Sequence, residues 1–240
     1  MRLYVSARQR DEIRRYQDLF DIVVTSGPPV DEDGPFLYWN GERLQLFSGH
    51  DGKPAAVCDE EIERRATFSS ELARACGVTR SRQPSVLDAL AGWGVDGMSL
   101  AALGSSLVMV EQNDAMWALL DSFLAHHPGQ RPELIHDDAW AVLDGSRSFD
   151  VVYLDPMYAR RRKGALPGKS MQLLALVCGP DQRSAADWID RARPCAAGRV
   201  VLKRRLRDPL VGRPDWQIKG HSVRYDVYRG RGDQAPLSTA

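Results

Sequence analysis

The sequence predicts an α/β protein whose main part, residues 83–230, is a Rossmann-like domain with a mostly parallel sheet. Two observations lead to this class. Short apolar runs alternate with helical patterns along this region, and a segment with three glycines follows the first run. Such alternation is typical of βαβ units, in which consecutive strands run parallel. Residues 1–82 do not alternate in this way, and we expect them to form a small α+β region.

Short runs rich in aliphatic residues are the expected parallel strands, and helical patterns lie between and after them. The strands are expected at 86–90, 107–111, 133–136, 149–154 and 199–203. The helices are expected at 96–103, 114–127, 169–178 and 185–193. Two further runs, 216–219 and 223–228, surround Gly220-His221-Ser222 and predict an antiparallel pair of strands near the C-terminus.

The N-terminal region contains a hairpin signal. Asn40-Gly41 separates the strand-like runs 36–39 and 42–47, and such a turn is expected to place both residues at positive φ. Residues 59–76 then predict one helix, which Gly77 ends. At the other end of the chain, we expect residues 231–240 to be a disordered tail.

The composition is that of a globular protein, with 240 residues of which 43% are hydrophobic and 27% charged. This length suits one sizeable domain, or a large domain with a small companion. No apolar run is long enough to span a membrane, and the N-terminal residues lack the apolar segment of a signal peptide. The four cysteines are widely spaced without a C-x-x-C pair, which predicts reduced thiols in a cytoplasmic protein with no zinc site.

The net charge of zero conceals an asymmetry between the two parts of the chain. Residues 1–155 hold 14 Lys and Arg against 25 Asp and Glu, whereas residues 156–240 hold 18 against 7. The main basic clusters consist of Arg160, Arg161, Arg162 and Lys163, and of Lys203, Arg204 and Arg205. Clustered cations are typical of proteins that bind the phosphate backbone of nucleic acids. The alternative is a solvated surface that pairs with the acidic part of the chain.

Gly92, Gly94 and Gly97 match the pattern G-x-G-x-x-G after the first expected strand. Glycines let the backbone approach a ligand closely, and the N-terminus of the next helix favours negative or polar groups. The same unit holds dinucleotides in dehydrogenases and S-adenosylmethionine in methyltransferases, and it also occurs as a simple tight turn. Asp88, which precedes the glycines, would repel a pyrophosphate and suits the cationic amino-acid end and sulfonium of S-adenosylmethionine.

Acidic residues also follow the next two expected strands. Glu111 ends the second strand, where a carboxylate accepts hydrogen bonds from ribose hydroxyls in either class of cofactor. After the third strand, Asp138 and the small Ala139 could meet an adenine amino group and leave room for its ring. Asp137 or Asp138 could equally cap the next helix.

The fourth expected strand ends in Asp155-Pro156-Met157-Tyr158, and this segment favours one cofactor. It resembles the [Asp/Asn/Ser]-Pro-Pro-[Tyr/Phe] motif of methyltransferases that modify exocyclic amino nitrogens of bases. Ligands of open α/β sheets bind beyond the carboxyl ends of the strands, where Asp155 is expected. The Asp155 carboxylate and the Pro156 carbonyl can both accept N–H bonds from an amine and aim it at a methyl group. Tyr158 can stack on the base.

Several segments together resemble the ribosomal small-subunit methyltransferase J family over about residues 84–230. They are VLDALAGWGVDG, MVEQN, LIHDDA, VVYLDPMY, KGAL, GPD, RVVLKR and KGHSVRYDVY. The resemblance implies a class I S-adenosylmethionine-dependent methyltransferase fold and methylation of the N2 amine of a guanosine in 16S rRNA, at family position guanine-1516. It implies the small ribosomal subunit as partner. No metal is expected, because a sulfonium already carries an activated methyl group.

Carried over by position, the family's cofactor contacts add to those expected at Asp88, Gly92 and Gly94. They fall on Val95, Asp96, Glu111, Gln112, Asp138, Ala139 and Asp155. This chain departs from the family pattern at several of them. The family has Arg in place of Val95 and of Gln112, and a Ser pair in place of Asp138-Ala139. Its segment R-R-K-F-G-G-G-R-G is replaced here by residues 64–70, RRATFSS, which belong to the expected N-terminal wall of the cofactor pocket.

Three other functions are compatible with these residues. The first is amino-methylation of another substrate, such as adenine in DNA or a small molecule. The second is a nicotinamide-dependent oxidoreductase, against which the charge of Asp88 argues. The third is a non-catalytic RNA-binding relative, which predicts salt-dependent RNA affinity without cofactor affinity.

Overall fold

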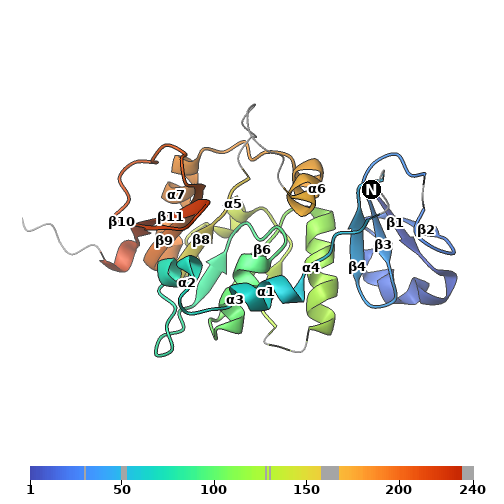
Figure 1. Ribbon diagram of the computed structural model, residues 1–240, viewed down its shortest axis with the longest axis horizontal. Helices are drawn as coiled ribbons and strands as arrows, with labels where there is room; N and C mark the ends of the chain where they lie inside the picture. The colour runs from blue at the N-terminus through green and yellow to red at the C-terminus, as the bar shows by residue number, and fades with distance from the viewer. Residues whose placement is uncertain (30, 50–52, 128, 130, 158–167, 234–240) are drawn as a thin grey trace, which may run out of the picture. The chain divides into compact units, whose positions relative to one another are not determined.

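A computed structural model describes residues 1–240 except 30, 50–52, 128, 130, 158–167 and 234–240. The described residues form two compact units, each built around its own sheet (Figure 1). One unit takes its residues from Cys58–Gln112, Gly129–Pro156 and Asp181–Ala240. The other takes them from Met1–Val57, Asn113–Pro128 and Met157–Pro180.

The first unit contains a seven-stranded sheet with the order β10-β11-β9-β8-β5-β6-β7. Five of its strands run parallel, and β11 is antiparallel to both β9 and β10. The parallel strands are β5 (Val86–Asp88), β6 (Leu107–Val110), β7 (Glu133–Ile135), β8 (Phe149–Leu154) and β9 (Ala196–Arg205). The remaining two are β10 (Trp216–Lys219) and β11 (Val223–Arg229). The mostly parallel sheet with a C-terminal antiparallel strand is therefore confirmed.

The order of these strands creates a switch point at β5. The chain runs outward from β5 to β6 and β7, and then returns to place β8 and β9 on the other side of β5. In open α/β sheets, ligands bind beyond the carboxyl ends of the strands at such a point. The glycine-rich segment directly follows β5, so the topology places it at the expected ligand site.

Two of the expected helices, 96–103 and 185–193, form in this unit, whereas the helix expected over residues 59–76 differs from the prediction. The helices of this unit are α1 (Asp59–Arg65), α2 (Glu71–Cys76), α3 (Val95–Ala102), α5 (Ala139–Val142), α7 (Ala185–Ala192) and the 3-10 helix η2 (Arg193–Cys195). The single helix expected over residues 59–76 is instead α1 and α2. Ala66 leaves the helical conformation, and the Ser70 side chain caps α2 by accepting a hydrogen bond from the Ala73 amide. Short hydroxyl side chains offer such caps and thus compete with a continuous helix.

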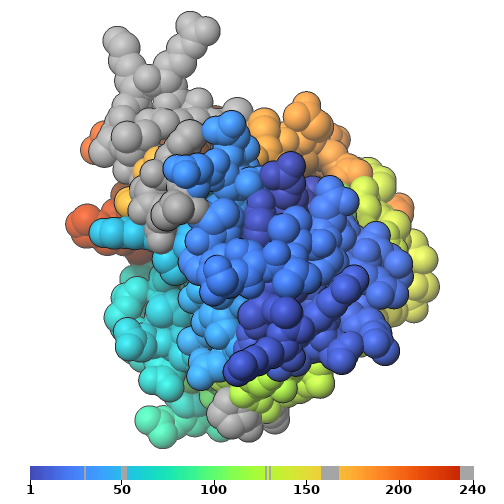
Figure 2. Space-filling model, turned by 90° about the vertical axis from the view of Figure 1, so that its right-hand side faces the viewer, coloured from blue at the N-terminus to red at the C-terminus, as the bar shows by residue number. Residues whose placement is uncertain are grey.

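The second unit contains a four-stranded sheet with the order β2-β1-β3-β4. Its elements are β1 (Arg2–Val5), the 3-10 helix η1 (Ala7–Tyr16), β2 (Asp21–Val24), β3 (Phe36–Trp39), β4 (Leu44–Phe47), α4 (Asp114–His126) and α6 (Lys169–Cys178). The Leu44 amide donates to Ser122 Oγ, and the Tyr16 hydroxyl donates to Asp121, which ties this sheet to α4. Figure 2 shows the face formed by the N-terminal residues of this unit in blue.

The expected hairpin forms, but its turn differs from the prediction. Strands β3 and β4 are antiparallel, with Trp39 paired to Leu44, so the loop spans residues 40–43. Only Gly41 in this loop has a positive φ, of 99°. The Asn40 side chain accepts hydrogen bonds from the amides of Glu42 and Arg43. Asn40 therefore closes the turn with its side chain and not with a left-handed backbone.

The division into units does not follow the expected boundary after residue 82. Residues 58–82 lie in the unit of the seven-stranded sheet, because α2 packs on β10 and β11. That residues 1–82 fold as a region of their own stays a prediction.

In the expected tail, Arg231–Asp233 form a 3-10 turn, and residues 234–240 lie outside the described part of the chain. Across the described residues, no helix combines the length and apolar character needed to span a bilayer.

Candidate active site

Charged side chains gather where neighbouring parallel strands end. Asp88 is the last residue of β5, Glu111 follows β6, Asp155 follows β8, and Lys203 lies near the end of β9. Because β9, β8, β5 and β6 are adjacent in that order, these residues emerge along one edge of the sheet. This edge is the one at which the switch point predicts a ligand.

The glycine loop forms the strand–loop–helix unit that the sequence predicts. Gly92 and Gly94 have φ of 54° and 70°, a region that favours glycine, and Gly94 is the N-cap residue of α3. The Gly92 amide donates to Glu111 Oε2 at 2.9 Å. The carboxylate expected to hold ribose hydroxyls is thus attached to the loop expected to cradle the cofactor.

Asp88 lies beneath this loop in an apolar environment. Only 1% of the residue is exposed, and its Oδ1 has no hydrogen-bond partner among the described residues. A Cβ built on Gly97 would lie 2.6 Å from Asp88 Oδ2, so α3 approaches the carboxylate as closely as its backbone allows. Burial, followed by the charges of Asp96 and Asp155, raises the pKa of Asp88 to about 8.

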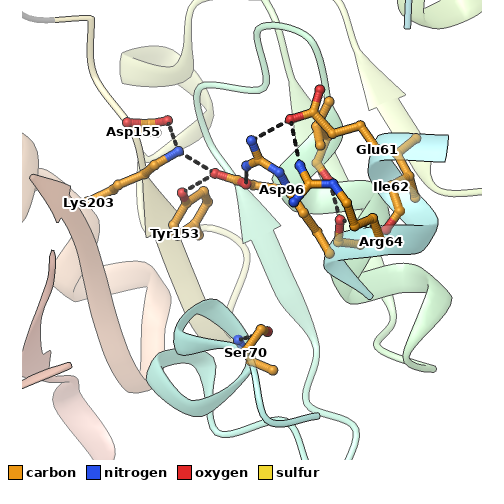
Figure 3. A network of polar contacts seen from close by, with 12 residues as sticks. Glu61, Ile62, Arg64, Ser70, Asp96, Tyr153, Asp155 and Lys203 are labelled. Atoms are coloured by element: carbon orange, nitrogen blue, oxygen red, sulfur yellow. Dashed lines mark hydrogen bonds and ion pairs between the residues drawn. The ribbon is translucent and has the colours of Figure 1, made fainter. Parts of the chain in front are cut away.

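Lys203 reaches between two carboxylates, as Figure 3 shows. Its Nζ lies 2.6 Å from Asp96 Oδ2 and 2.9 Å from Asp155 Oδ2. The Tyr153 hydroxyl donates to the same Asp96 oxygen at 2.7 Å, and Arg65 donates to Asp96 Oδ1 at 2.8 Å. The side chain of Asp96 is 10% exposed and that of Asp155 is 38% exposed. Of the two carboxylates that Lys203 joins, Asp155 is therefore the more exposed.

The network separates the pKa values of its carboxyl groups. Burial raises the pKa of Asp155, and Asp96 adds to this effect while Lys203 opposes it. Burial also acts on Asp96, but Lys203, Tyr153 and Arg65 together hold its pKa below the usual value. Burial lowers the pKa of Lys203, but the charges of Asp155 and Asp96 outweigh it and raise that pKa. Lys203 is consequently a permanent cation in this site.

Arg65 is a site residue that the sequence interpretation missed. It lies at the end of α1, in the segment that departs from the family pattern, and it bridges Asp96 and Glu61. A signal was present in the sequence, since the Arg64-Arg65 pair is shared with the family segment R-R-K-F-G-G-G-R-G.

Asp138 serves as a helix cap, one of the two roles left open by its sequence. Its Oδ1 accepts a hydrogen bond from the Trp140 amide at the start of α5. Both Asp138 oxygens also bind the guanidinium of Arg183, which stacks on the Trp140 ring. Ala139 is buried behind this cap. An adenine contact of Asp138 stays a prediction, and it would have to be shared with Arg183.

The other predicted residues fall into three groups. Val95 and Asp96 are the first residues of α3, Pro156 is buried beside Asp155, and Gln112 is exposed beside Glu111. Tyr158 and Arg160, Arg161, Arg162 and Lys163 lie outside the described residues. The third group consists of Lys203, Arg204 and Arg205. Burial alternates along these residues of β9, so their side chains do not form one surface.

This alternation argues against the phosphate contacts expected for two of the three cations on β9. Lys203 points into the site, and the Arg204 side chain is 9% exposed and lies 3.9 Å from Asp208. Arg205 alone is exposed. Arg224 from the same basic part of the chain is also buried, where it pairs with Asp226 and donates to backbone carbonyls of residues 205–209. Of the three cations on β9, Arg205 is thus the one whose side chain is exposed to a phosphate.

The residues present fit S-adenosylmethionine. Asp88 Oδ1 is buried without a hydrogen-bond partner among the described residues, so it could accept a hydrogen bond from a ligand donor. Gly92 and Gly94 have the positive φ of a loop whose backbone can lie against a ligand. Glu111 offers a carboxylate at the end of the second strand. In the part of the chain described, no three His, Cys, Asp or Glu side chains are grouped to hold a metal ion, and the expected independence from metal stays a prediction.

Comparison with known proteins gives consistent matches. A family model described as SAM-dependent methyltransferase matches residues 29–230. The "Ribosomal RNA small subunit methyltransferase J" of Magnetococcus marinus is 41% identical over 214 residues, covering 81% of this chain and 84% of that protein. The protein of the same name from Pseudomonas aeruginosa is 37% identical, covering 95% and 94%. A crystal structure of a SAM-dependent methyltransferase from Neisseria gonorrhoeae matches with a TM-score of 0.71 and 28% identity, and covers both chains completely.

Proposed function

The chain belongs to the ribosomal RNA small subunit methyltransferase J family of SAM-dependent methyltransferases, and on that premise we propose that it methylates the N2 amine of a guanosine in 16S rRNA. Its larger unit has the class I fold of these enzymes. One observation carries the proposal. Asp155 and Pro156 follow the strand beside the glycine loop, and the Asp155 carboxylate is reachable from outside.

The roles of the chain's own residues follow from their positions. S-adenosylmethionine supplies an electrophilic methyl group on a sulfonium when it is bound. Gly92, Gly94 and Glu111 would hold the nucleoside part of S-adenosylmethionine, and Asp88 would accept a hydrogen bond from its amino-acid end. Asp155 and the Pro156 carbonyl accept N–H bonds from the guanine amine, which localises the nitrogen lone pair and aims it at the methyl carbon. As the N–C bond forms and the C–S bond breaks, one amine proton leaves, and Asp155 is placed to accept it.

The choice of an RNA substrate rests on the relatives' names and on the basic C-terminal part of the chain. Arg205 and Arg207 are exposed at the end of β9 and in the loop that follows it, beyond the strand end that carries Lys203. Cations at this edge would meet the phosphates of an RNA whose base enters the site. Stacking by Tyr158, phosphate contacts at Arg160–Lys163, the position guanine-1516 and a cytoplasmic location are parts of the same proposal.

The test is methyl transfer from labelled S-adenosylmethionine to small ribosomal subunits that lack the modification, followed by identification of the digested nucleosides. Labelled N2-methylguanosine is the expected product. Label in another nucleoside would support the rival amino-methyltransferase. Cofactor binding without label would remove the proposed substrate. RNA affinity without cofactor affinity would support the non-catalytic relative.

A further inference from the structure

The strongest unexplained feature of the site is the position of Lys203. A lysine in a basic run at a strand end is ordinarily solvated, but the Lys203 side chain is only 18% exposed. Its ammonium contacts Asp96 and Asp155 simultaneously, at 2.6 and 2.9 Å. The cation therefore lies inside the site and joins the carboxylate at the start of α3 to the carboxylate that faces the substrate (Figure 3).

The balance of charges around Lys203 explains what it does there. Three carboxyl groups, those of Asp88, Asp96 and Asp155, influence one another in this region. Two cations, Lys203 and Arg65, compensate these negative charges. Arg65 binds Asp96 and Glu61. Among the described residues, Lys203 is the one cation within ion-pair distance of Asp155. The ionisable groups that face the Lys203–Asp155 pair from the surrounding elements are Asp88, Asp96, Arg65, Tyr153 and Tyr225.

We propose that Lys203 is a positioning residue of methyl transfer, which keeps the Asp155 carboxylate charged and fixes its orientation toward the substrate amine. Lys203 contacts one oxygen of Asp155, Oδ2, and this contact restrains the rotation of the carboxylate. A carboxylate accepts hydrogen bonds on both oxygens, so the other oxygen stays available to the amine. The proposal rests on the proposed function, because it assigns the amine as the group that Asp155 receives.

A shift in the pKa of Asp155 distinguishes this role of Lys203 from a purely structural one. Burial and Asp96 raise the pKa of Asp155, and Lys203 opposes them. Removal of the ammonium should therefore raise this pKa, and a protonated Asp155 loses its capacity as a doubly accepting carboxylate. Removal of the Asp96 charge should act in the opposite direction, because Asp96 is a like charge that shares the same lysine.

The experiment measures kcat for methyl transfer to undermethylated small ribosomal subunits between pH 5 and pH 9.5, at saturating S-adenosylmethionine. In Lys203→Met, the acid limb of the profile should move to higher pH by roughly one unit or more, with activity partly recovered at high pH. Lys203→Arg should keep the limb close to that of the unmutated protein. Asp96→Asn should move it to lower pH.

The matched control is Arg147→Met, which removes a cation at the amino-terminal end of the same sheet. Arg147 pairs with Glu133 at the start of β7, and within the described part of the chain it has no ion pair with a site residue. Its profile should coincide with that of the unmutated protein. A Lys203→Met profile that is lower at every pH but has an unmoved acid limb would overturn the proposal, as would shifts of the same sign in Lys203→Met and Asp96→Asn.

A second measurement does not depend on activity. The carboxyl carbon of Asp155, assigned with Asp155→Asn, can be titrated by NMR in the unmutated protein, in Lys203→Arg and in Lys203→Met. An Asp155 titration that moves upward only in Lys203→Met supports the proposal, and coincident titrations overturn it. If the unmutated protein methylates no guanosine, the proposed function fails, and the titration still decides whether Lys203 sets the charge of Asp155.

Discussion

Gly97 lies directly against Asp88, so that a Cβ at position 97 would come within 2.6 Å of Asp88 Oδ2. Two more atoms, from Leu107 and Met109, would lie 3.3 Å away. Glycine at this helical position therefore allows α3 to pack on the end of β5 while a carboxyl group fills the space between them. The third glycine of the pattern serves packing here, whereas Gly92 and Gly94 have positive φ.

Gly97→Ala is expected to destabilise the protein by about 1–3 kcal/mol through overpacking. The sign of this change in stability is informative, because alanine in an unobstructed helix would stabilise the helix by about 1 kcal/mol relative to glycine. Chemical denaturation of the two proteins measures the difference. The clash depends on the Asp88 side chain, so Gly97→Ala should cost much less in an Asp88→Ala background. Equal costs in both backgrounds would show that Asp88 is not the obstacle.

The raised pKa of Asp88 predicts how stability depends on pH. The folded state holds the Asp88 proton up to about pH 8, while the unfolded chain releases it near its ordinary pKa of 3.8. The folded state thus binds more protons between these values. This group's stabilisation is fully present below the lower value and is lost as pH rises toward about 8, at up to about 1.4 kcal/mol per pH unit.

Asp88→Asn tests this linkage, because its side chain is neutral at every pH. Urea unfolding at several pH values between 5 and 8 should show the mutant gaining free energy of unfolding relative to the unmutated protein as pH rises. A difference that is constant across this range would mean that Asp88 has the same pKa in the folded and unfolded chains.

Glu111 is expected to control cofactor affinity. Its carboxylate holds the Gly92 amide and is placed to accept the ribose hydroxyls, so Glu111→Ala removes hydrogen bonds that each contribute about 1.5–3 kcal/mol when charged. We expect S-adenosylmethionine to bind at least about tenfold more weakly, as measured by calorimetry. Glu133→Ala is the control, because Glu133 pairs with Arg147 at the start of β7 and should leave affinity unchanged. Equal affinities of Glu111→Ala and the control would remove Glu111 from the cofactor site.

The sequence was sufficient to predict much of the larger sheet and the location of the site. Strands β8 and β10 have the expected bounds, and the other strands of that sheet begin or end within a few residues of them. Buried parallel strands are short and nearly uniformly apolar, so they stand out from the amphipathic helices between them. The positions of Asp88 and Asp155 at strand ends could be predicted, because Asp88 ends one short apolar run and Asp155 follows another.

The role of Lys203 could not be predicted, because a run of three cations reads as one basic cluster in sequence. Successive residues of a strand point to opposite faces, and the structure separates Lys203, Arg204 and Arg205 accordingly. The direction of each side chain depends on acidic partners from distant segments, such as Asp96 from α3. Local pattern also failed in residues 59–76, where the cap made by Ser70 interrupts a sequence with helical periodicity.

We propose that Asp155 aligns the substrate amine for methyl transfer, and a variant without this carboxylate isolates that role. The rate of N2-methylguanosine formation on undermethylated small subunits is compared between the unmutated protein and Asp155→Ala, with S-adenosylmethionine affinity measured in parallel. We expect Asp155→Ala to bind the cofactor but to form the product at least about 100-fold more slowly. An Asp155→Ala variant that methylates the guanosine at the rate of the unmutated protein would contradict it.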